Sequence, residues 1–150
     1  MKFKWLALFI VLSACQETPE PTLEPVAAGL TRTPSPDGAA VYFVSPHDSA
    51  RVPAGMVEVI FGLSGMEVVP AGVDSLNTGH HHLLVNASEW PPLGQPIPAD
   101  SVHLHFGLGQ TETTLDLSPG TYTLQLLLGD YLHIPHDPPV YSERITLIVE

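Results

Sequence analysis

The chain has 150 residues and carries sixteen acidic against five basic side chains, so its formal charge is −11 with neutral histidines. Two of the basic residues lie in the first fourteen, and without that segment three arginines face sixteen carboxylates, a formal charge of −13. Such a charge argues against a nucleic-acid partner and gives weak support to a cation as ligand. The single cysteine, Cys15, excludes an intramolecular disulfide.

The N-terminus has the pattern of an export signal. Lys2 and Lys4 precede an apolar run over residues 5–12, which is too short to span a bilayer comfortably. The run ends in small residues before Cys15, and this ending resembles the lipobox of bacterial lipoproteins, in which the cysteine is lipidated. We therefore predict a signal peptide over residues 1–14, with the membrane as partner through a lipid on Cys15. An ordinary signal peptide or an uncleaved anchor is the alternative.

The residue after the cysteine, Gln16, indicates to which membrane the protein is sent. Gln16 stands where an Asp would resemble the signal for retention at the inner membrane. The resemblance implies a lipid-anchored protein of the bacterial cell envelope, at the outer membrane and facing the periplasm.

Residues 15–35 are rich in Pro, Glu and Thr and show neither apolar alternation nor helical spacing, so we predict a disordered tether. The remaining residues, 36–150, are enough for one domain with a real core. Apolar and polar residues alternate over several short runs separated by Pro-Gly and Asp-Gly turn signals, which predicts strands. The expected strands are 39–44, 56–63, 80–86, 102–106, 112–117, 121–129 and 142–149. The fold class is therefore all-β, an immunoglobulin-like antiparallel β-sandwich, with a small β-barrel as the alternative.

Seven of the eight histidines fall into three short clusters between residues 80 and 136. The candidate metal ligands are His80, His82, His103, His105, His133 and His136. Neutral imidazole is a common ligand for zinc and copper, and the donor set contains no mature thiol, which favours Cu(II) or Zn(II) over Cu(I). His47 lies outside the clusters and is expected to be solvated.

The alternation of side chains along a strand predicts which histidines share a face. Because successive side chains of a strand point to opposite faces, His103 and His105 share one face, about 7 Å apart along the strand. His80 and His82 likewise share a face, so His81 must point away. A structural hydrogen-bond network is the alternative use of these imidazoles.

Five longer motifs stand out in the sequence: Thr78–Val85, Ile97–Asp100, His103–Glu112, Leu124–Asp130 and His133–Glu143. They resemble the bacterial domain-of-unknown-function family 4399. The resemblance covers about residues 36–150 and implies an exported single domain whose histidine motifs belong to the signature of the family. It implies no activity. Family members often carry a further histidine where Tyr122 stands, which implies a reduced or differently completed site here if that position is a ligand elsewhere.

Two functions follow from the sequence. The first is a membrane-tethered envelope lipoprotein that binds copper or zinc through clustered histidines. The second is a non-catalytic, immunoglobulin-like interaction module of the envelope, with a protein partner and structural histidines. No catalytic residue is assigned, because no nucleophile elbow, phosphate-binding loop or mature lysine is present.

Overall fold

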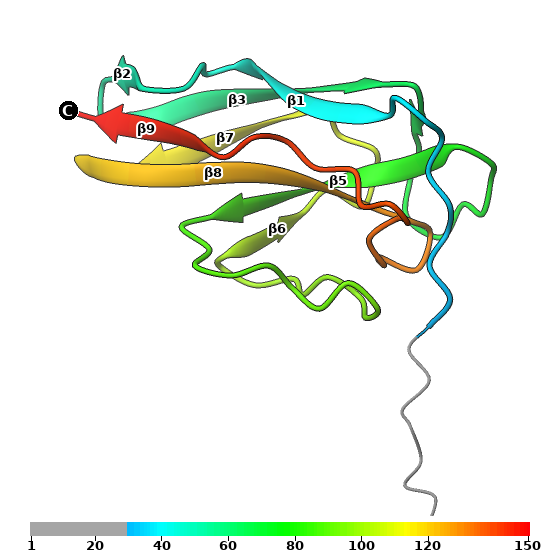
Figure 1. The fold of residues 1–150 in the computed structure, drawn as a ribbon. Helices are drawn as coiled ribbons and strands as arrows, with labels where there is room; N and C mark the ends of the chain where they lie inside the picture. The colour runs from blue at the N-terminus through cyan, green and yellow to red at the C-terminus, as the bar shows by residue number, and fades with distance from the viewer. Residues whose placement is uncertain (1–29) are drawn as a thin grey trace, which may run out of the picture.

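The computed structural model describes residues 30–150, which form two β-sheets and no helix (Figure 1). The predicted signal peptide, the predicted lipidation site Cys15 and the first part of the predicted tether lie outside the described residues. Within the described part, there is no helix of the length and apolarity needed to cross a membrane. The prediction of a sandwich-like all-β fold is confirmed.

The smaller sheet has three antiparallel strands in the order β1, β3, β7. These strands are β1 Ala40–Ser45, β3 Gly55–Ser64 and β7 Glu112–Leu117. Val57, Val59 and Phe61 of β3 are buried, whereas the residues between them are more exposed. The period-2 alternation of the sequence thus sends one face of this sheet into the core.

The larger sheet has six strands, and it runs in the order β2, β9, β8, β5, β4, with β6 also paired to β5, farther along that strand than β4. Its strands are β2 Ala50–Val52, β4 Glu67–Val68, β5 Thr78–Val85, β6 His103–His105, β8 Gly120–Gly129 and β9 Ile145–Val149. The short strands β2 and β4 were not predicted, and both run parallel to their neighbours. The larger sheet is therefore mixed, which corrects the expectation of purely antiparallel pairing.

The main core fills the space between the sheets, where β3 packs against the inner faces of β8 and β9. Leu124, Leu126, Leu128 and Leu147 are fully buried there. Burying such a side chain stabilises a fold by about 1.5–3 kcal/mol relative to leaving it exposed, so this layer supplies most of the driving force for folding.

The outer face of the larger sheet is also covered near β5. Leu84 and Leu127 form a second apolar cluster with Ala87 and Ile97 of the long segment between β5 and β6. In Figure 1 this segment and β6 lie below β5 and β8, on the side away from β1 and β3. Residues of β5 are consequently buried on both faces from Thr78 to Leu84. A strand covered on both sides can hold polar side chains away from water.

The folded unit begins before residue 36. Thr33 accepts a hydrogen bond from the backbone N–H of Asp137, and Ser35 donates one to the carbonyl of Asp137. Arg32 forms an ion pair with the Asp137 carboxylate at 3.1 Å. Residues 32–35, at the end of the predicted tether, thus contact the domain through hydrogen bonds and an ion pair.

Candidate metal centre

The three consecutive histidines of β5 point to two different environments. His81 faces the main core, where its ring lies 5.2 Å from that of Phe61. His80 and His82 point to the outer face and lie 4.9 Å apart between ring centroids. All three side chains are fully buried. The alternation of the strand therefore separates one core histidine from a pair on the opposite face.

The register between β5 and β6 brings a third histidine to this pair. His105 is paired with His82, and directly opposed residues in an antiparallel pair point to the same face. The ring of His105 lies 5.0 Å from that of His82 and 5.1 Å from that of His80. One ring nitrogen from each of these three residues lies within 4.8 Å of the others. The three histidines therefore form a cluster that could hold a metal ion.

The two buried imidazoles are spaced as ligands of one ion would be. Their Nε2 atoms lie 3.1 Å apart. Two nitrogens bound tetrahedrally at 2.0–2.1 Å from zinc would lie about 3.3 Å apart. The Nδ1 atoms of His80 and His82 have no hydrogen-bond partner among residues 30–150. The same Nε2–Nε2 distance also allows a hydrogen bond between the two rings, in which one nitrogen donates and the other accepts.

His133 joins the cluster from the segment that follows β8. Its ring lies 4.7 Å from that of His105 and 4.9 Å from that of His80, but 6.1 Å from that of His82. The residue has a φ of 67°, in the left-handed region that few non-glycine residues adopt. His133 and His105 are the less buried members, so the site is closed at the β5 side and open toward solvent.

Two glycines leave room for the histidine rings. A Cβ at Gly129, which is paired with His80, would lie 3.0 Å from Nε2 of His82. A Cβ at Gly107 would overlap the ring of His105. Neither glycine was predicted to belong to the site. Their positions two residues from His105 and four residues before His133 were the only signal available.

The other two predicted ligands point elsewhere. Nδ1 of His103 donates a hydrogen bond of 3.0 Å to the carboxylate of Asp100, because His103 is paired with Leu84 and lies farther along the strands. Nε2 of His136 donates to the backbone carbonyl of Thr78 at 3.1 Å, in a fully buried position. The structure thus brings ring nitrogens of His80, His82 and His105 within 4.8 Å of one another and places the ring of His133 beside them. It gives His103 and His136 hydrogen-bond partners of their own.

Burial shifts the protonation equilibria of the cluster. It lowers the pKa of His80 from 6.5 to about 4 and that of His82 to about 2, and repulsion from neighbouring protonated histidines acts in the same direction. Burial likewise lowers the pKa of His105. At neutral pH these imidazoles are therefore in the neutral form, which is the form that binds metal ions.

Tyr122 lies away from this site. It occupies the face of β8 that packs against the main core, and its hydroxyl donates to the carbonyl of Ser118 at 3.1 Å. Gly129 and Leu127, which lie beside the clustered histidines, are on the opposite face of the same strand. A histidine at position 122 would not reach the cluster, so the tyrosine at this position does not remove a metal ligand from the site.

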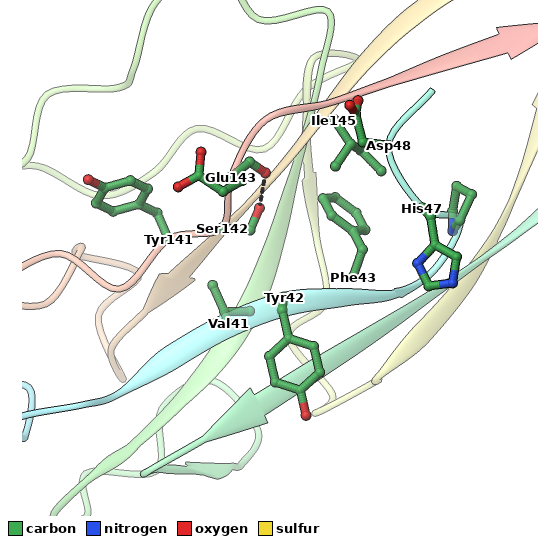
Figure 2. A pocket seen from close by; sticks show the side chains of 10 residues that line it. Val41, Tyr42, Phe43, His47, Asp48, Tyr141, Ser142, Glu143 and Ile145 are labelled. Atoms are coloured by element: carbon green, nitrogen blue, oxygen red, sulfur yellow. Dashed lines mark hydrogen bonds between the residues drawn. The ribbon is translucent and has the colours of Figure 1, made fainter. Parts of the chain in front are cut away.

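A separate concavity of about 400 Å³ lies between β1 and the segment that leads into β9. Figure 2 shows Tyr42, His47 and Tyr141 around it, and none of the clustered histidines lines it. His47 is exposed, as the sequence predicts. It is consequently a suitable control residue for experiments on the cluster.

The fold and the site define an all-β sandwich with a histidine cluster that could hold a metal ion. Residues 59–150, more than half of the chain, match the model of a family described as Domain of unknown function (DUF4399). The chain therefore belongs to this family, and the resemblance seen in the sequence is confirmed. All the clustered histidines lie in the matched range. Comparisons with curated proteins and with solved structures found no match.

Proposed function

We propose that this protein binds one divalent transition metal ion, copper(II) or zinc(II), through His80, His82 and His105. The observation that supports the proposal is the convergence of their ring nitrogens within 4.8 Å from two paired strands. His133 is the candidate fourth ligand, because its ring lies against those of His80 and His105. An all-imidazole set of neutral nitrogens suits Cu(II) and Zn(II).

The neutral state of the buried pair supports a ligand function. Burial lowers the pKa of His80 to about 4 and that of His82 to about 2, so at neutral pH each ring keeps a nitrogen lone pair that a metal ion can accept.

Calorimetric titration of untagged, metal-free protein with Zn(II) and Cu(II) at pH 7.5 tests the proposal. We expect one ion per chain for the wild type and for His47→Ala, and no binding above background for His82→Ala. His82→Ala removes a ligand whose ring lies 4.9 Å from that of His80 and 5.0 Å from that of His105. His47→Ala changes an exposed histidine that lines the other concavity. A folded wild type that binds neither ion would refute the proposal and show that the histidines are structural.

We further propose that the metal-binding domain is a lipoprotein of the cell envelope, anchored through Cys15 and facing the periplasm at the outer membrane. The support is the ordered sequence of basic, apolar and small residues before the single cysteine. A radioactive fatty acid should label the wild type and not Cys15→Ser. Equal labelling of the two chains would refute the anchor without affecting the metal proposal.

A further inference from the structure

The segment that carries His133 is shaped by one buried carboxylate. Asp130 is 1% exposed, and its Oδ1 accepts hydrogen bonds of 2.9 Å from the backbone N–H groups of Leu132 and Ile134. The N–H of His133 donates to the carbonyl of Asp130 at 2.9 Å, and the carbonyl of His133 accepts from Ile97 at 2.8 Å. The peptide groups on both sides of His133 are therefore held, and the residue keeps its left-handed backbone.

The other carboxylate oxygen of Asp130 is held by residues 32–35, which we call the N-terminal strap. The hydroxyl of Thr33 donates to Oδ2 at 2.7 Å, and it is the one side-chain donor to this oxygen within residues 30–150. A carboxylate removed from water depends on such donors to keep its orientation. Thr33 thus reaches the backbone of His133 through a single intervening side chain.

The strap also holds the far end of the same segment. The guanidinium of Arg32 donates to the carbonyl of Pro135 at 3.0 Å and to that of His136. Pro34 and Asp137 form a parallel bridge. The strap therefore contacts the 130–137 segment at its beginning and at its end, with His133 between these contacts.

We propose that Thr33 and Asp130 are positioning residues for His133, so that docking of the N-terminal strap decides whether the metal ion has a fourth histidine ligand. This inference rests on the proposed metal-binding function. Groups that orient a ligand from outside the coordination sphere commonly change metal affinity by about 10- to 100-fold when they are replaced. The strap belongs to the part of the chain that the sequence assigns to the membrane tether, so it links that tether to the metal site.

Thr33→Val removes the hydroxyl and keeps the shape of the side chain. We expect it to lower Zn(II) affinity by about 10-fold or more, as His133→Ala does, and to reduce the number of nitrogens coupled to Cu(II) in electron paramagnetic resonance from four to three. Thr33→Ser restores the donor and should recover the wild-type spectrum. Ser35→Ala is the matched control, since the Ser35 hydroxyl donates to Pro138 and not to Asp130.

A double variant separates positioning from a general loss of stability. If Thr33 acts through His133, then Thr33→Val/His133→Ala should bind no more weakly than His133→Ala alone. Arg32→Ala, which releases the far end of the segment, should weaken binding in the same direction and serves as a second variant if Thr33→Val does not fold.

The outcomes are distinguishable. A folded Thr33→Val that keeps four nitrogens and wild-type affinity, while His133→Ala loses both, would overturn the positioning role and leave the metal site in place. An unchanged His133→Ala would overturn the role as well. A wild type that binds neither metal would overturn the proposed function itself, and the inference with it.

Discussion

The chain contains two His-x-His strands, β5 and β6, that use the same sequence pattern with different results. On β5 both His80 and His82 enter the cluster and are fully buried. On β6 only His105 enters, and it is exposed, while His103 donates to Asp100. The difference arises from register, because His105 is opposite His82 and His103 is opposite Leu84. Alternation decides which face a side chain occupies, but pairing decides what it meets there.

The largest expected effect is on metal affinity, and it should differ between the two histidines of β6. His105→Ala should lower Zn(II) affinity at pH 7.5 by more than about 100-fold, beyond what the loss of an outer positioning group costs. His103→Ala, on the same strand and the same face, should change affinity by less than about threefold because its nitrogen is held by Asp100. Competition titration with a chromophoric chelator measures both. Equal losses in the two variants would show that the pairing does not select the ligand.

His81, the third histidine of β5, faces the core and should therefore affect stability rather than metal binding. Burial lowers the pKa of His81 to about 4 in the folded state, below the 6.5 of an unfolded chain. The unfolded state therefore binds more protons between these values, and His81 makes stability fall as pH drops from 6.5 to 4. His81→Leu should abolish this loss, which amounts to about 2 kcal/mol at pH 5.

Urea unfolding of the two metal-free proteins at pH 7.5 and pH 5 tests this expectation. The advantage of His81→Leu should grow as the pH falls, while its Zn(II) affinity at pH 7.5 stays at the wild-type level, since His81 faces the core. An unaltered pH dependence, or a loss of metal binding, would contradict the assignment of His81 to the opposite face.

Gly107→Ala displaces the exposed ligand without removing it. The new Cβ would overlap the ring of His105, which is free to move because it is exposed. We expect Zn(II) affinity to fall by about tenfold, comparable to the loss of an orienting group, with little change in melting temperature. Gly72→Ala is not a suitable control, because Gly72 has a φ of 84°. Gly120→Ala, whose Cβ would have no neighbour closer than 3.6 Å, is the better one.

The smallest effect concerns pH and metal affinity. If three ligands had a pKa of 6.5, proton competition at pH 5.5 would lower affinity by about 1000-fold. The pKa values of His80 and His82 are about 4 and about 2, so these two ligands are still neutral at pH 5.5. Affinity should therefore fall by less than about tenfold between pH 7.5 and 5.5. A thousandfold fall in a calorimetric titration would show that the buried pair is protonated as in water.

Much of the local structure could be predicted from the sequence. The seven predicted strands all appear, because each has a period-2 pattern long enough to detect. The separation of His81 from His80 and His82 also follows from alternation alone. The strands β2 and β4 were not predicted, because they are two or three residues long and lie outside the runs in which apolar and polar residues alternate. The equally short β6 was predicted because His103 and His105 alternate with Val102, Leu104 and Phe106.

The loops were less predictable. His133 and His136 occupy one Pro-rich segment, and nothing in their spacing shows that His133 turns toward the cluster while His136 donates to Thr78. That choice depends on a carboxylate, Asp130, and on Thr33, which lies 97 residues earlier in the chain. The composition of residues 15–35 favours a tether, so the strap contacts at its end could not be read from it.

By itself, the sequence determined the all-β class, seven of the strands and which histidines of a strand share a face, because these follow from the two-residue period of an extended chain. The tertiary structure alone decided which histidines meet. The register of β5 with β6, the layer over the outer face and the docking of residues 32–35 are long-range contacts. They depend on how distant segments pack together, and no local pattern of residues encodes that packing.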